Sequence, residues 1–238
     1  MRNIYLSPHL DDVAFSLGTR ALDEPGGVLV NACSVSGYVA GAPLDQRPSP
    51  DVVERTSATR NDEDAHFAKL ASLERIALGL AEPNVHGLSP FGSRDLAARM
   101  AAIGEPLRAA LDRLQLEGGP ARLFVPAGIG RHVDHLAVRD IAIDWYRAKP
   151  DRATLAFYED LPYAADWRKR VQGILDLLRV TRGFRLTRKS WPASPQKLRA
   201  INLYASQHAQ PVTVPATFSP AALWPRGAHE AIWEVVAR

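Results

Sequence analysis

The fold of this chain is signalled first by residues 3–12, which read NIYLSPHLDD. The apolar run before Pro8 predicts a β-strand, and the proline ends the strand because it restricts the preceding residue to an extended conformation. His9, Asp11 and Asp12 then follow at the start of a predicted helix. A strand that runs directly into a helix is typical of α/β proteins, so an imidazole and two carboxylates are predicted at the carboxyl end of the first strand.

A second cluster of the same composition lies past the middle of the chain, where residues 130–135 read GRHVDH. It follows another short apolar run and precedes another predicted helix. Because the carboxyl ends of the strands meet at one crevice in open α/β sheets, the two clusters are expected to face each other. The potential metal ligands in each cluster are three residues apart, His9 and Asp12 in the first and His132 and His135 in the second.

The rest of the chain alternates between short apolar runs and longer segments of helical period. Strands are predicted at residues 3–7, 27–36, 122–126 and 153–158, and helices at residues 51–73, 93–115, 133–146, 167–180 and 194–207. This alternation predicts an α/β fold with a Rossmann-like, mostly parallel sheet flanked by helices. We expect a single domain over residues 1–238, because 238 residues of which 46% are hydrophobic can bury one large core.

Composition and charge exclude several classes of protein. The net charge of +3 arises without any block of like charges, which argues against a nucleic-acid partner. No stretch approaches the roughly 18 apolar residues of a membrane span, and the first residues do not read as a signal peptide. The single cysteine, Cys33, excludes an intramolecular disulfide and lies in an apolar run, where a thiol is typically part of the core. We therefore expect a cytoplasmic protein without a membrane span.

Each cluster also has a simpler structural interpretation. Asp11 and Asp12 could cap the helix that follows them, since aspartate in the first turn satisfies free amides and suits the helix dipole. His132 and His135 could be ordinary core or surface histidines. The joint occurrence favours chemistry, because three of the seven histidines lie beside three aspartates at two strand ends. Two histidines and a carboxylate for a metal, with a further carboxylate and histidine for proton transfer, indicate a zinc hydrolase.

The two motifs together resemble the PIG-L/LmbE-like zinc deacetylases, which remove acetyl groups from N-acetylglucosamine-type sugars. That family opens with a strand that runs into an Ala/Ser-Pro-His-x-Asp-Asp motif, matched here by residues 7–12, and its later His-x-Asp-His motif is matched by residues 132–135. The likeness extends over most of the chain. Further matches are Arg60 and Glu63 in an Arg-x-x-Glu pattern, YEDLPY at residues 158–163, and a late helix over residues 197–207.

The resemblance implies an LmbE-like fold and a role for each polar residue of the first motif. His9 and Asp12 would bind zinc together with His135, which leaves one or two coordination positions for water and substrate. Two neutral imidazoles and one carboxylate leave Zn²⁺ with a net positive charge, which lowers the pKa of a bound water to about 7. Asp11 would be the general base. The same ligand set can also hold Fe²⁺ or Co²⁺.

The second motif would supply the general acid. A protonated His132, which Asp134 orients and keeps charged, would stabilise the tetrahedral intermediate and protonate the leaving amine. Some relatives have a tyrosine two positions before this histidine that helps to bind the oxyanion, whereas this chain has Gly130. The oxyanion contact then comes from elsewhere, or zinc and His132 suffice. Arg60 resembles an arginine that contacts sugar hydroxyls or a phosphate, although an arginine on an exposed helix is more often solvated.

The sequence thus predicts a zinc-dependent hydrolase that removes an acetyl group from a small N-acetylated amino sugar or a glycoconjugate. Two alternatives stay open: a non-catalytic sugar- or nucleotide-binding module on the same fold, and a metal-dependent hydrolase of another small amide. Asp11 and His132 argue against the binding module, since a pure binder needs neither a base nor an acid. The loops at residues 37–50 and 83–93, with the C-terminal third, are expected to set substrate specificity.

Overall fold

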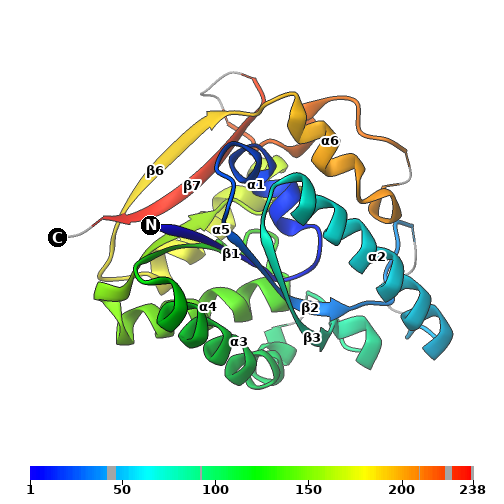
Figure 1. Ribbon diagram of the computed structural model, residues 1–238, viewed down its shortest axis with the longest axis horizontal. Helices are drawn as coiled ribbons and strands as arrows, with labels where there is room; N and C mark the ends of the chain where they lie inside the picture. Colours follow the sequence, from blue (N-terminus) through cyan, green and yellow to red (C-terminus); the bar gives the residue numbers. More distant parts are fainter. Residues whose placement is uncertain (42–46, 92, 209, 223–226, 237–238) are drawn as a thin grey trace.

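The computed structural model describes residues 1–41, 47–91, 93–208, 210–222 and 227–236. Its centre is a seven-stranded sheet in the order β3-β2-β1-β4-β5-β7-β6. The strands are β1 (Arg2–Ser7), β2 (Val28–Val35), β3 (Glu74–Ala81), β4 (Ala121–Pro126), β5 (Ala153–Tyr158), β6 (Arg185–Pro192) and β7 (His229–Val236). The helices are α1 (Asp12–Asp23), α2 (Pro50–Leu70), α3 (Leu96–Gly118), α4 (Val133–Ala148), α5 (Trp167–Val180) and α6 (Gln196–Asn202). Figure 1 shows α1, α2 and α6 on one side of the sheet and α3 and α4 on the other.

The sheet is mostly parallel, which confirms the predicted α/β fold. β1 pairs with β2 and β4, β2 with β3, and β4 with β5, all in parallel. β7 joins β5 in the antiparallel direction, and β6 joins β7 in the same way. The strands β1, β2, β4 and β5 are largely buried, and strands covered on both faces are continuous apolar runs, which is why the sequence predicts them. Cys33 in β2 is buried, as predicted.

The sequence does not predict three of the strands, namely β3, β6 and β7. They lie at or next to the two edges of the sheet, and β3 and β6 consist of exposed and partly buried residues. Half-exposed edge strands lack the continuous apolar run by which a buried strand is recognised. The helix predicted at residues 194–207 is also shorter than expected, because α6 is followed by a separate 3-10 turn at Ala205–Gln207.

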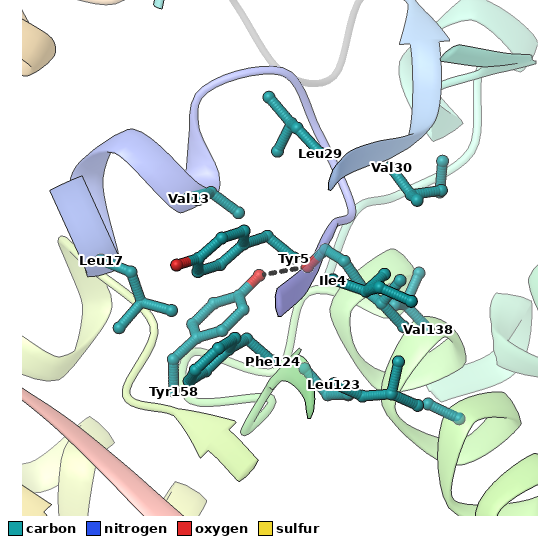
Figure 2. Close-up of a cluster of buried hydrophobic side chains, with 14 of the residues drawn as sticks. Ile4, Tyr5, Val13, Leu17, Leu29, Val30, Leu123, Phe124, Val138 and Tyr158 are labelled. Atoms are coloured by element: carbon teal, nitrogen blue, oxygen red, sulfur yellow. Dashed lines mark hydrogen bonds between the residues drawn. The ribbon is translucent and has the colours of Figure 1, made fainter. Parts of the chain in front are cut away.

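Aromatic residues from neighbouring strands connect the centre of the sheet (Figure 2). The ring of Tyr5 in β1 stacks on that of Phe124 in β4, with the centroids 4.8 Å apart. The hydroxyl of Tyr158 in β5 donates to the carbonyl oxygen of Leu6 in β1 at 2.9 Å. These contacts hold β1, β4 and β5 together, so the loops that leave their carboxyl ends are fixed relative to one another.

The carboxyl ends of β1, β4 and β5 therefore meet at one place. The strand order reverses between β1 and β4, and such a switch point is where open α/β proteins bind ligands. Residues 8–12, 127–135 and 159–163 follow these three strands directly. In the part of the chain that the structure describes, no helix is both long and apolar enough to cross a membrane.

Candidate metal centre

Three side chains from the two sequence motifs meet at the carboxyl end of the sheet. Nδ1 of His9 lies 3.3 Å from Oδ2 of Asp12, and Nε2 of His135 lies 3.3 Å from Oδ1 of Asp12 and 3.3 Å from Nδ1 of His9. All three residues are buried. Ligand atoms about 2.0 to 2.2 Å from one Zn²⁺ are roughly 3.0 to 3.6 Å apart, so this triangle fits a metal ion.

Local backbone structure orients the first two members of the triangle. Pro8 follows β1 directly, and Asp12 is the first residue of α1. The amide N–H of His9 donates to Oδ2 of Asp12 at 2.8 Å, which holds the carboxylate beside the imidazole. The spacing of three residues across this strand-to-helix turn brings both side chains to the same point.

His135 comes from the first turn of α4, where His132 is the N-cap residue. The second ring nitrogen of His135, Nδ1, contacts Oδ1 of Asp160 at 2.7 Å. Asp160 also accepts a hydrogen bond from the amide of Ile129 at 2.8 Å. Metal-binding histidines usually place their other nitrogen on such a carboxylate, which fixes the tautomer and the ring orientation. The sequence predicts no such role for Asp160, although an acidic residue just after a buried strand is a signal that could identify it.

Asp134 supports His9 in the same manner. Its Oδ2 lies 3.1 Å from Nε2 of His9, and its Oδ1 accepts a hydrogen bond from Nε of Arg99 at 2.5 Å. Asp134 is linked to His132 by its backbone amide, which donates to Nδ1 of His132 at 3.2 Å. The carboxylate of Asp134 therefore contacts His9 rather than His132, where it is expected from the sequence. Asp134 does fix the tautomer of an imidazole, but the imidazole is that of His9.

The charges around the site move the pKa values of its histidines in opposite directions. Burial alone would lower the pKa of His135, but Asp12 and Asp160 together more than offset this and the pKa rises to about 9. Asp12 raises the pKa of His9 against the same effect of burial. Burial, together with the positive charge of His9 and His135, holds the pKa of His132 well below its usual value. Because Nδ1 of His132 accepts an amide proton, this ring is neutral in the observed arrangement and carries its own proton on Nε2.

His132 also lies close to the triangle. One nitrogen from each of His9, His132 and His135 lies within 4.8 Å of the other two, so these three buried imidazoles could hold a metal as well. The ring of His132 meets that of His9 edge-on, with the centroids 4.4 Å apart. The contacts of 3.3 Å made by Asp12 favour Asp12 as the third ligand.

Asp11 lies beside the triangle and is held by a buried arginine. Its Oδ1 accepts a hydrogen bond from Nη2 of Arg60 at 3.1 Å, and Nη1 of Arg60 donates to Glu82 at 2.7 Å and to Ser36 at 2.6 Å. Arg60 is only 2% exposed, so it is not a solvated helix residue. Burial raises the pKa of Asp11, and the guanidinium of Arg60 counteracts that rise. A direct contact between Arg60 and substrate stays a prediction.

A pocket opens onto these residues. Besides the two motifs and Arg60, its walls include Tyr38, Asn84, Phe91, Pro162, Tyr163 and Gln207. Several of these come from the loops and the C-terminal third in which specificity is expected, and residues 42–46 and 92 of those loops lie outside the described residues. Phe91 is 47% exposed, and an exposed aromatic ring at the wall of a pocket offers an apolar face to a sugar.

The fold and the site together define a class of protein. A mostly parallel α/β sheet carries, at its switch point, two buried imidazoles and a carboxylate that fit a metal, with another carboxylate beside them. This is the arrangement of a metal-dependent hydrolase.

Similarity to known proteins supports this class. The chain is 28% identical over 218 residues to the 2'-N-acetylparomamine deacetylase of Streptomyces fradiae, and the match covers 87% of this chain and 73% of that protein. A deacetylase from the biosynthesis pathway of teicoplanin matches with a TM-score of 0.68 at 20% identity, over 99% of this chain and 98% of that chain. The A40926 pseudoaglycone deacetylase matches with a TM-score of 0.63 at 20% identity, over 99% and 97% of the two chains. No family model matches the chain. The predicted resemblance to the PIG-L/LmbE-like deacetylases is confirmed by the shared fold and by the sequence similarity to a deacetylase.

Proposed function

We propose that this protein is a metal-dependent N-deacetylase that releases acetate from a small N-acetylated amino sugar or a glycoconjugate. The observation that carries the proposal is the buried triangle of His9, Asp12 and His135 with Asp11 beside it. The sequence similarity to a 2'-N-acetylparomamine deacetylase supports the same reaction. A single domain over residues 1–238 and a cytoplasmic location stay predictions.

The metal would be held by His9, Asp12 and His135. When bound, it supplies a Lewis acid that polarises the amide carbonyl and makes a water molecule acidic near neutral pH. We propose zinc, because two imidazoles and one carboxylate are a common catalytic zinc set, with Fe²⁺ and Co²⁺ as alternatives for the same donors. One of the structurally similar proteins is a zinc-inhibited form of a teicoplanin deacetylase, so the concentration of zinc has to be varied in any test.

Asp11 transfers a proton from the attacking water to the leaving nitrogen. Its carboxylate lines the pocket, and the hydrogen bond from Arg60 holds it in one orientation. As the attacking water loses its proton, Asp11 accepts it, and as the C–N bond breaks, Asp11 passes it to the leaving nitrogen. A carboxylate whose pKa is raised by burial is suited to both steps.

His132 acts as a neutral hydrogen-bond donor. Its Nδ1 accepts the amide proton of Asp134, so the Nε2–H is the group available to substrate. This role differs from the protonated acid that the resemblance implies, and the hydrogen bond accepted at Nδ1, which requires a neutral ring, supports it. Asp134 then affects the reaction by orienting the imidazole of His9.

The function is tested by incubating purified protein with N-acetylparomamine, N-acetylglucosamine conjugates and an N-acetylated glycopeptide, and by measuring both acetate and free amine. We expect equal amounts of both products from at least one compound, and a large loss of release in His132→Ala. Protein that binds one metal ion and releases neither product from any compound would contradict the proposal and favour a binding module.

A further inference from the structure

Tyr163 lies against the metal centre and takes no part in the proton transfers above. Its ring meets that of His135 edge-on, with the centroids 5.9 Å apart, and it meets the ring of Phe91 in the same manner at 6.3 Å. Tyr163 also lines the pocket that contains Asp11 and His132. The tyrosine is therefore part of the pocket wall directly beside a candidate metal ligand.

Gly130 makes room for this ring. Its φ of +91° lies in the region that favours glycine. A Cβ atom at this position would clash with the Cβ, Cγ and Cδ1 atoms of Tyr163. The loop that carries His132 therefore contributes no side chain here, and Tyr163 from a different loop occupies the space.

The hydroxyl of Tyr163 forms no hydrogen bond with any residue that the structure describes. Two other tyrosines of the chain have partners, since Tyr158 donates to a main-chain carbonyl and Tyr204 to a carboxylate, each at 2.9 Å. Burial, together with the charges of Asp12 and Asp11, raises the pKa of Tyr163, so the hydroxyl keeps its proton. A donor that has no partner among the described residues, and that lines the same pocket as Asp11 and Asp12, is available to a substrate.

The loop that carries Tyr163 is held rigidly. Its Asp160 contacts Nδ1 of His135, and the backbone carbonyl of Asp160 accepts the amide proton of Ala164 at 2.7 Å. The amide of Leu161 donates to Oγ of Ser16 in α1 at 3.0 Å. The same loop thus orients a metal ligand and fixes Tyr163, and a donor that needs no reorganisation is the kind that stabilises developing charge best.

We infer that Tyr163 is a catalytic residue whose hydroxyl donates a hydrogen bond to the acetamide oxygen as that oxygen becomes negatively charged. The inference rests on the proposed deacetylase function. Water adds to the carbonyl carbon, the electron pair of the C=O bond moves to oxygen, and the proton from water goes to Asp11. When the C–N bond breaks, the carbonyl re-forms and that proton passes to the leaving nitrogen. Tyr163 keeps its own proton throughout, and its hydrogen bond is strongest in the charged intermediate.

Tyr163→Phe tests this assignment, because it removes only the hydroxyl and keeps the ring against Gly130 and His135. We expect kcat to fall about 10²- to 10³-fold, with KM changed less than about threefold, as for the loss of one oxyanion donor. Metal content and the thermal midpoint should stay at the wild-type values. Affinity for a methylphosphonamidate analogue of the acetamide should fall by about the same factor as kcat/KM, because the analogue imitates the charged intermediate.

A matched tyrosine variant accompanies the test. Tyr146→Phe alters a ring of α4 that packs on Phe184, and it should keep wild-type kcat and KM. Full kcat in Tyr163→Phe would overturn the assignment while the deacetylase function stands. Wild-type protein that releases no amine from any compound would overturn the function and the assignment together.

Discussion

The carboxylate of Asp134 lies 3.1 Å from Nε2 of His9, although the two residues belong to different motifs. This contact directs the other nitrogen of His9, Nδ1, toward Asp12 and His135. Asp160, in the loop after β5, contacts Nδ1 of His135 in the same way. Each candidate histidine ligand is thus oriented by a carboxylate from a different loop, and the metal centre depends on the packing of three strand ends.

Removing either of these supporting carboxylates should weaken metal binding. We expect Asp134→Asn and Asp160→Asn each to lower metal affinity about 10- to 100-fold, because the imidazoles lose the groups that fix their orientation and basicity. Competition with a chromophoric chelator measures the affinity. Asp144→Asn, on the exposed face of the same helix as Asp134, is the matched control and should bind metal as the wild type does. Wild-type affinity in both supporting variants would contradict the arrangement.

Asp11→Ala should separate metal binding from catalysis. Asp11 is outside the triangle, so we expect the variant to retain one metal per chain while turnover falls about 10²- to 10⁴-fold, the usual contribution of a general base. His135→Ala should lose both the metal and the activity. The two variants are compared by elemental analysis and product release on the same samples, and an active Asp11→Ala would show that another group takes the proton.

Metal binding should release protons near neutral pH. In the metal-free protein the pKa of His135 is raised to about 9, so this residue is protonated at pH 7, whereas a metal requires the neutral imidazole. Affinity should therefore rise as pH increases toward about 9, by up to about tenfold per pH unit for each proton displaced, and fall as pH decreases. Calorimetric titration in two buffers with different ionisation enthalpies counts the protons. Equal heats in both buffers at pH 7 would contradict the assignment of His135 as a ligand.

The buried ion pair between Lys197 and Glu230 should be important for stability. Their charged atoms lie 3.0 Å apart, both side chains are 0% exposed, and Glu230 also accepts a hydrogen bond from the amide of Thr19. Lys197→Met leaves an uncompensated buried carboxylate, so we expect a loss of about 3 to 5 kcal/mol in the free energy of unfolding. Lys189→Met removes an exposed partner of Glu234 and should cost less than about 1 kcal/mol. Denaturant titrations compare the two, and equal costs would contradict the prediction.

The sequence predicts the parts of this fold that have a local signal. Buried parallel strands are apolar runs, and both metal motifs follow such runs, so the meeting of His9 with His135 could be expected from position alone. The edge strands lack that signal, since residues such as Arg188 and Lys189 interrupt β6. Other contacts depend on how loops pack: which imidazole Asp134 reaches cannot be read from its spacing, and it reaches His9 instead of His132.

The most direct test of the account is to measure metal content and turnover on one sample before chelation, after chelation, and after return of metal at increasing concentration. We predict one metal ion per chain, loss of acetate release on chelation, and recovery when about one equivalent of zinc, iron or cobalt is returned. Full activity in protein that contains no metal would contradict the central claim that His9, Asp12 and His135 form a catalytic metal centre.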